Sequence, residues 1–132
     1  MVIDTSAFLA ILQDEPERGP FNRAIAEAAL RRTSAATFLE ASMVLEARHG
    51  ADGVQMLDAL IESAGIEVVA VDLAQSRIAR RTFARFGKGR HPAAFNYGDC
   101  FAYALARQLG EPLLCKGNDF RRTDLDLVPL PA

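Results

Sequence analysis

The chain has 132 residues, half of them apolar, and a formal net charge of −2. This length predicts a single domain over residues 1–132 that is large enough to bury a core. No stretch approaches the ~18 uncharged apolar residues of a membrane span, and Asp4 stands where a secretory signal would be basic or apolar. We therefore expect a cytoplasmic protein without a membrane partner.

The first half of the chain predicts two short strands and four helices. The strands cover residues 1–3 and 32–35, and the helices cover residues 5–12, 17–31, 37–50 and 52–65. Thr37 and Glu40 have the spacing of a capping box, in which the first residue caps the helix and the acid occupies its third position. On this assignment Asp4 follows directly on the first strand.

The second half of the chain predicts three more strands and two helices. The strands cover residues 66–71, 113–115 and 128–130. We expect Asp72 to cap the first of these helices, whose apolar stripe consists of Ile78, Ala79, Thr82, Phe83 and Phe86. Asn96 is expected to cap the second helix, which places Asp99 at its third position. Free backbone N–H groups and the helix dipole favour an anion there.

Positive charge is concentrated between Asp72 and Asp99. This segment contains no acid and its bases contribute +6, whereas the rest of the chain carries −8. Such a segment in an acidic protein indicates a specific anionic partner. The candidate binding residues are Arg77, Arg81 and Arg85, spaced every fourth residue along the predicted helix, and Lys88 and Arg90 in the glycine-rich loop that follows.

Strands that alternate with helices predict a three-layer α/β fold, with a mostly parallel central sheet flanked by helices. Ligands of such folds bind beyond the carboxyl ends of the strands. The acids expected at that edge are Asp4, Glu40, Asp99 and Asp119. Each could serve only as a helix cap or in a turn, but together they would repel one another. A divalent cation would compensate, and ligands that are all carboxylates favour Mg²⁺ or Mn²⁺.

A metal site beside basic residues favours phosphate-ester chemistry. Several phosphate-binding folds fit the sequence poorly. It has neither a Walker A motif nor G-x-G-x-x-G, and Asp4-Thr5-Ser6 lacks the second aspartate of the phosphatase pattern. Lys116 is placed like the lysine of a response-regulator receiver, but the early acidic pair and the central phospho-acceptor aspartate of receivers are absent.

Four motifs in this order resemble a PIN domain and, more narrowly, the VapC toxins of bacterial type II toxin–antitoxin systems. They are residues 2–7, Glu40 after Ser-Ala-Ala-Thr, residues 96–100 and residues 116–120, and residues 87–91 also recur in that family. The resemblance covers essentially the whole chain. It implies a Mg²⁺- or Mn²⁺-dependent endoribonuclease that cleaves structured RNA, such as tRNA or ribosomal RNA, and inhibits translation.

The resemblance also implies roles for individual residues. The catalytic and metal-binding acids would be Asp4, Glu40, Asp99 and, as the more variable member, Asp119. Thr5 or Ser6 would position a water molecule or a phosphate oxygen. Asp124 fits the cap of a short turn better than an additional place among the acids.

The implied partners are RNA, a cognate VapB-type antitoxin and a second copy of the chain. The apolar surfaces of the predicted helices between residues 17 and 65 are consistent with a partner, although they could equally be internal core. Two other functions stay open at this point: a PIN-type nuclease of RNA maturation without an antitoxin, and a non-catalytic RNA- or protein-binding module. An antitoxin gene directly upstream would exclude the first, and metal-dependent RNA cleavage would exclude the second.

Overall fold

A computed structural model describes residues 1–130, which form a four-stranded parallel sheet with the order β3-β2-β1-β4. The strands are β1 (Val2–Ile3), β2 (Arg32–Ser34), β3 (Glu67–Val69) and β4 (Leu113–Leu114). The chain adds β2 and β3 on one side of β1 and later places β4 on its other side. This reversal puts a topological switch point beside β1, at the carboxyl ends of β1 and β4.

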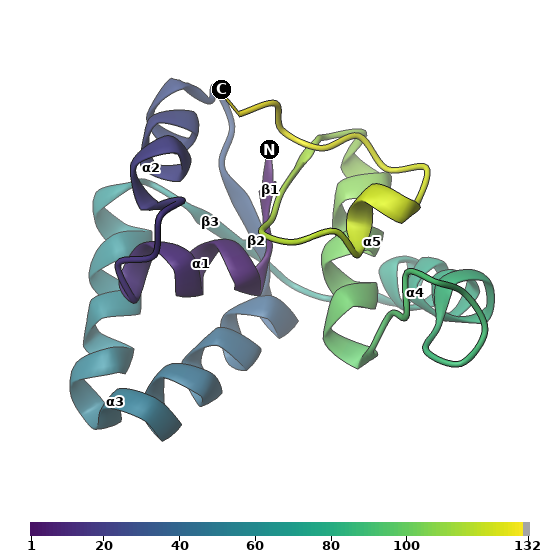
Figure 1. Cartoon of the computed structure of the whole chain (residues 1–132), viewed down its shortest axis with the longest axis horizontal. Helices are drawn as coiled ribbons and strands as arrows, with labels where there is room; N and C mark the ends of the chain where they lie inside the picture. Colours follow the sequence, from purple (N-terminus) through teal and green to yellow (C-terminus); the bar gives the residue numbers. More distant parts are fainter. Residues whose placement is uncertain (131–132) are drawn as a thin grey trace.

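Helices cover both faces of the sheet, as the sequence predicted (Figure 1). One layer contains α1 (Thr5–Leu12), α2 (Arg18–Glu27) and α3 (Ala35–Ser63), and the other contains α4 (Leu73–Phe86) and α5 (Tyr97–Leu109). A short 3₁₀ helix, η1 (Phe120–Arg122), follows β4. Within residues 1–130, no helix has both the length and the apolar character that crossing a membrane requires.

The inner strand β1 and its neighbour β4 explain why the core has two halves. Val2 and Leu113 pack toward α4 and α5, whereas their neighbours Ile3 and Leu114 pack toward α1, α2 and α3. Successive side chains of a strand point to opposite faces, so two apolar residues per strand suffice to join both layers to the sheet. β1 is therefore buried on both faces, and its carboxyl end is held in place by both layers.

Aromatic rings connect the layer of α4 and α5 to the segments around it. The Phe95 ring has no solvent exposure. Its centroid lies 5.7 Å from that of Phe86, 5.9 Å from that of Tyr103 and 5.1 Å from that of Phe120. These separations are typical of favourable aromatic contacts. Phe95 thus anchors the loop between α4 and α5 directly before the start of α5.

The boundaries of two helices in the first half of the chain, α2 and α3, differ from the prediction. The helix predicted at 17–31 ends at Glu27, because the chain becomes extended at Ala28 on its way into β2. The helices predicted at 37–50 and 52–65 form one element, α3, interrupted at Gly50 by a φ of 64° and a ψ of −151°. Glycine populates this backbone region readily, so Gly50 provides the bend that separates the two arms of α3.

The predicted capping box of Thr37 and Glu40 is wrong. Ser34 caps α3 instead, and its hydroxyl accepts a hydrogen bond from the Ala36 backbone N–H at 3.2 Å. Thr37 therefore lies within the first turn, where it is buried. Because Glu40 stands one turn further into the helix than predicted, its carboxylate does not bind the backbone of its own helix end.

Two further expectations are wrong, one for the last strand and one for Phe83 in α4. Residues 128–130 form no strand, and only Leu127 makes an isolated bridge to Leu113. Proline at position 129 cannot donate a ladder hydrogen bond. Phe83, predicted to lie in the core, is 40% exposed. In contrast, the caps by Asp72 and Asn96 are confirmed.

Asp124 neither joins the acids nor caps a turn. It accepts a hydrogen bond from the Tyr103 hydroxyl and pairs with Arg85 at 3.2 Å and Arg107 at 2.7 Å. These donors lower the pKa of Asp124, the hydrogen bond from Tyr103 most of all. Asp124 therefore fastens the segment after η1 to α4 and α5.

Candidate active site

The first turns of α1, α3 and α5 gather at the carboxyl end of the sheet (Figure 1). Asp4 lies at the centre of this region, directly after β1, and is only 5% exposed. It caps α1, and its carboxylate accepts hydrogen bonds from the backbone N–H of Ser6 at 3.1 Å and from the Ser6 hydroxyl at 2.7 Å. Burial raises the pKa of Asp4, the hydrogen bonds of Ser6 lower it, and the charge of Glu40 raises it further.

Asp99 closes the capping box predicted at the start of α5. Its carboxylate accepts from the backbone N–H of Asn96 at 3.0 Å, and the Asn96 side chain accepts from the Asp99 N–H at 3.0 Å. The pKa of Asp99 is raised to about 6, first by burial and then by the negative charges of Asp4, Asp119 and Glu40. The electrostatic field at Asp99 therefore includes all three of the other predicted acids.

Glu40 reaches the same region from the second turn of α3. Its carboxylate accepts a hydrogen bond of 2.5 Å from the Thr5 hydroxyl on α1. On its other side lies Gly98 of α5, so close that a Cβ at that position would stand 2.6 Å from the Glu40 Cδ. Glu40 thus connects α1, α3 and α5, the elements on which the three predicted acids Asp4, Glu40 and Asp99 stand.

Asp119 is the most peripheral of the predicted acids. It is exposed and precedes η1, where its side chain makes no capping hydrogen bond. The turn before it contains Gly117 with a φ of 97°, a conformation that favours glycine. Asp119 contributes negative charge to the field at Asp99, but the protein does not fix its carboxylate as it fixes the other three.

The negative charge of the four acids is not balanced by cations of the protein. Among residues 1–130, none of the salt bridges includes Asp4, Glu40, Asp99 or Asp119. The amino group of Lys116, just after β4, instead lies 3.3 Å from both Glu15 and Glu17. Adjacent carboxylates with an oxygen-only donor set and no counter-charge fit a hard divalent cation.

The carboxylates point to protein donors rather than to a common centre. In the described part of the chain, no three His, Cys, Asp or Glu side chains stand in a metal-binding arrangement. Asp4 bonds Ser6, Glu40 bonds Thr5 and Asp99 bonds the Asn96 N–H. Each carboxylate offers oxygen ligands, which Mg²⁺ and Mn²⁺ prefer, so the chemistry of the donor set fits either ion.

The sequence analysis did not identify Gly98 as a neighbour of the Glu40 carboxylate. The one available signal was a glycine in the first turn of a helix, where alanine is the better helix former. Thr5 and Ser6 were predicted to position water or phosphate. In the structure their hydroxyls donate to Glu40 and Asp4, and the Ser6 hydroxyl also accepts from the Lys116 backbone N–H at 2.9 Å.

The predicted RNA-binding residues are all exposed on α4 and the following loop. Within residues 1–130, Arg85 is the one of them that forms a salt bridge, with Asp124, and it also lies 4.6 Å from the centroid of the Phe86 ring. Arg90 lies 5.5 Å from the centroid of the Phe83 ring. The loop is closed at its base by hydrogen bonds of 2.9 Å from the Lys88 N–H to the Phe95 carbonyl and from the Phe95 N–H to the Phe86 carbonyl. Lys88 therefore stands next to the segment that enters α5.

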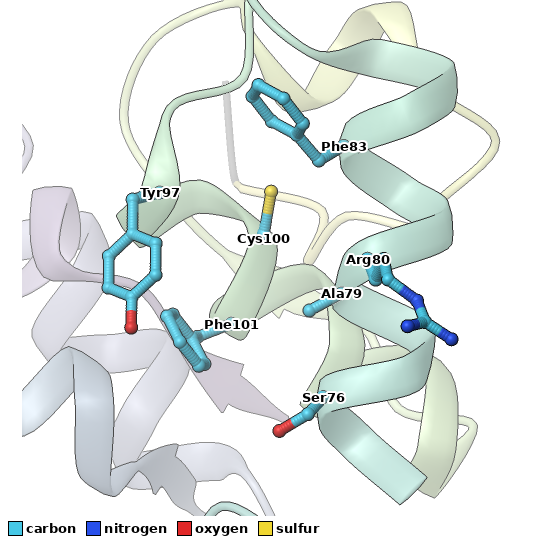
Figure 2. A pocket seen from close by; sticks show the side chains of 7 residues that line it. All are labelled: Ser76, Ala79, Arg80, Phe83, Tyr97, Cys100 and Phe101. Carbon is cyan, nitrogen blue, oxygen red and sulfur yellow. The ribbon is translucent and has the colours of Figure 1, made fainter. Parts of the chain in front are cut away.

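A pocket of about 560 Å³ lies between α4 and α5 (Figure 2). Its lining consists of Ser76, Ala79, Arg80, Phe83, Tyr97, Cys100 and Phe101. Tyr97 and Phe101 are one helical turn apart, so Asp99, midway between them, lies on the opposite side of α5. The pocket is thus separate from the acids.

Comparison with known proteins points to one family. The PIN domain family matches residues 1–125. The chain is 47% identical over 131 residues to Ribonuclease VapC30 of Mycobacterium tuberculosis (strain ATCC 25618 / H37Rv), an alignment that covers 99% of this chain and 100% of that protein.

Solved structures share the fold at low sequence identity. The crystal structure of Mycobacterium tuberculosis VapC20, a toxin that cleaves the sarcin-ricin loop, has a TM-score of 0.78 and 20% identity, covering 96% of this chain and 97% of VapC20. A toxin–antitoxin complex from Klebsiella pneumoniae contains a chain with a TM-score of 0.71 and 12% identity, covering 96% of this chain and 95% of that one.

Proposed function

Because this chain belongs to the VapC ribonuclease family of PIN domains, we propose that its carboxylate cluster binds Mg²⁺ or Mn²⁺ and hydrolyses phosphodiester bonds of structured RNA. The match to this family confirms the resemblance seen in the sequence. The chain is a ribonuclease toxin of a toxin–antitoxin system. The observation that carries the proposal is the proximity of Asp4, Glu40 and Asp99 at or near the starts of α1, α3 and α5, with no salt bridge to any of them within residues 1–130.

In the proposed reaction the residues of the chain hold and orient the reacting groups. Asp4, Glu40 and Asp99 would hold the ion through carboxylate oxygens, with Asp119 at the exposed rim. A bound ion would make its coordinated water more acidic and stabilise negative charge on the phosphate. The hydroxyls of Thr5 and Ser6 keep Glu40 and Asp4 in fixed orientations, and the burial of Asp4 strengthens electrostatic interactions at the site.

The test of this function is RNA cleavage with controlled metal content. The purified chain is incubated with total tRNA or ribosomal RNA in Mg²⁺ or Mn²⁺, in excess chelator, and after the metal is restored. We expect discrete cleavage products only when the metal is present. Cleavage that continues at the same rate in chelator would contradict the metal site, and binding of RNA without cleavage would favour a non-catalytic module.

We propose that the basic residues of α4 and its loop hold phosphates next to the cut. Arg77, Arg81, Lys88 and Arg90 are exposed and form no salt bridge within residues 1–130, so their charges are available to an anion. Arg85 would contribute less, because Asp124 already neutralises part of its charge. The closed base of the loop places Lys88 beside the start of α5, from which Asp99 reaches the acids.

Substitution of both Lys88 and Arg90 by glutamine should weaken RNA binding and its salt dependence. Each lost contact with a single-stranded phosphate is expected to reduce the slope of log K against log salt by about 0.7. Fluorescence anisotropy with a labelled RNA between low and high salt measures this slope. Glutamine substitution of Arg18 and Arg23, both exposed on α2, is the matched control. Equal slopes for both double variants and the unchanged chain would leave α4 and its loop without a role in RNA binding.

We further propose a cognate VapB-type antitoxin and a homodimer, acting in the cytoplasm, where tRNA and ribosomal RNA are found. The toxin–antitoxin complex from Klebsiella pneumoniae supports the first partner. The large apolar residues of α2, Phe21 and Ile25, are internal core and offer no surface. α3, by contrast, exposes Leu39 at 58%, Met43 at 61% and Met56 at 43%. Apolar side chains that gather into one exposed patch are typical of a protein interface, and these residues of α3 are the candidates for such a patch.

A further inference from the structure

Gly98 occupies the second position of α5, between the cap residue Asn96 and the helix interior. A Cβ built on Gly98 would lie 2.6 Å from the Glu40 Cδ and 2.8 Å from its Oε1. Cβ atoms in proteins do not approach other heavy atoms this closely. The Glu40 carboxylate therefore fills the space that any other side chain at position 98 would need.

The backbone of Gly98 does not itself require glycine. Its φ lies outside the left-handed region, in contrast to those of Gly50, Gly65, Gly89, Gly110 and Gly117. In a helix, alanine is favoured over glycine because glycine loses more conformational freedom. The reason for a glycine at this position is thus the close approach of Glu40 and not the shape of the chain.

Contacts on two sides restrict the Glu40 carboxylate. The Thr5 hydroxyl donates to its Oε1 from α1, and the side-chain-free surface of Gly98 borders it from α5. The first turn of α5 also carries backbone N–H groups without helical partners, which attract an anion. Asp99 is the next residue along the chain, so a side chain at position 98 that displaces Glu40 also changes the position of Glu40 relative to Asp99.

We propose that Gly98 is a positioning residue: its missing side chain lets the Glu40 carboxylate stand beside Asp99 in the metal site. This inference rests on the proposed function, because it assigns Gly98 a role in assembling the same site. This role does not require Gly98 to contact the ion or the RNA. It acts through Glu40.

The variant Gly98→Ala tests this role by metal binding rather than by cleavage. Isothermal titration with MnCl₂ should show an affinity about ten-fold or more below that of the unchanged chain, a loss typical for residues that orient metal ligands. The melting temperature in chelator should be equal or higher, because alanine favours the helix. Gly19→Ala is the matched control: Gly19 is the second residue of α2, and its Cβ would meet only the Arg23 Nη1, at 3.7 Å. We expect Gly19→Ala to leave the Mn²⁺ affinity unchanged.

Rescue by a shorter acid distinguishes positioning from general damage. Glu40→Asp removes one methylene and makes room for a Cβ at position 98. We expect Gly98→Ala to lower the Mn²⁺ affinity of the Glu40→Asp chain by less than two-fold. A loss as large as in the unchanged chain would overturn the inference, as would an unaltered affinity of Gly98→Ala alone.

Two further results have defined meanings. If Gly98→Ala fails to fold, Glu40→Ala in the same chain should restore folding, and failure to do so would place the conflict elsewhere and overturn the inference. If the unchanged chain binds no Mn²⁺ and cleaves no RNA with metal present, the proposed function fails and the inference fails with it. Normal Mn²⁺ binding by both the unchanged chain and Gly98→Ala refutes the positioning role alone.

Discussion

Asp4→Asn is expected to reduce RNA cleavage by about a thousand-fold or more while making the metal-free chain more stable. The rate falls because a neutral amide is a poor ligand for Mg²⁺ or Mn²⁺, and several kcal/mol of transition-state stabilisation correspond to such a factor. The fold is kept because the amide oxygen of asparagine can still accept the hydrogen bonds that the Asp4 carboxylate accepts from Ser6.

The stability gain follows from the direction of the pKa shift. Burial raises the pKa of Asp4 above its ordinary value. A carboxyl group whose pKa is higher in the folded than in the unfolded state destabilises the fold at pH values above the unfolded pKa, and this cost disappears as the pH falls below that value. An uncharged asparagine removes the cost at every pH.

Cleavage rates in saturating Mg²⁺ and melting curves in chelator at neutral pH measure both effects. Asp58→Asn, at an exposed position of α3, is the matched control and should change neither quantity. An Asp4→Asn chain that melts well below the unchanged one, combined with cleavage that ignores metal, would show that Asp4 is only a helix cap.

Phe95→Ala is expected to cost about 3–5 kcal/mol of the free energy of unfolding, a large part of the stability of a typical domain. Phe95 is fully buried among Phe86, Tyr103 and Phe120, so removal of its ring takes away these contacts and leaves a cavity in the core. The melting temperature should fall by more than about 10 °C. Since Phe95 directly precedes the Asn96 cap, loosening of the loop should also weaken Mn²⁺ binding through Asp99.

Phe83→Ala is the matched control for this prediction. It removes the same side chain from neighbouring α4, where Phe83 is 40% exposed, and should cost about 1 kcal/mol. Denaturant unfolding of the two variants compares the costs directly. A loss for Phe95→Ala as small as that expected for Phe83→Ala would mean that the Phe95 ring contributes little to the fold.

Local patterns in the sequence predicted much of the fold and the placement of Asp4 and Asp99 at helix starts. The capping box of Asn96 and Asp99 involves residues three positions apart, and the structure contains both of its hydrogen bonds. Asp4 was placed correctly because a short apolar strand directly precedes it. Parallel strands share one carboxyl edge, so the expectation that the acids meet there needed only the alternation of strands and helices.

The features that the sequence did not predict correctly depend on how separate elements meet in the fold. Ser34 competes with Thr37 for the cap of α3, and only the end of β2 decides between them. Arg85 forms its salt bridge with Asp124, which is 39 residues away in the chain. The close approach of Gly98 and Glu40 requires two helices to meet, which no spacing along the sequence reveals.

The order of the strands has a consequence for synthesis of the protein on the ribosome. β1 is made first, but one of its two neighbours, β4, is made after α5. Until residues 113–114 have emerged, the central strand lacks a partner on one side and the loop that carries Asp119 does not exist. A site whose acids are spread from residue 4 to residue 119 is thus assembled late, by contacts of long sequence separation that form slowly. The growing chain therefore does not carry the complete set of proposed metal ligands next to the ribosome that is making it.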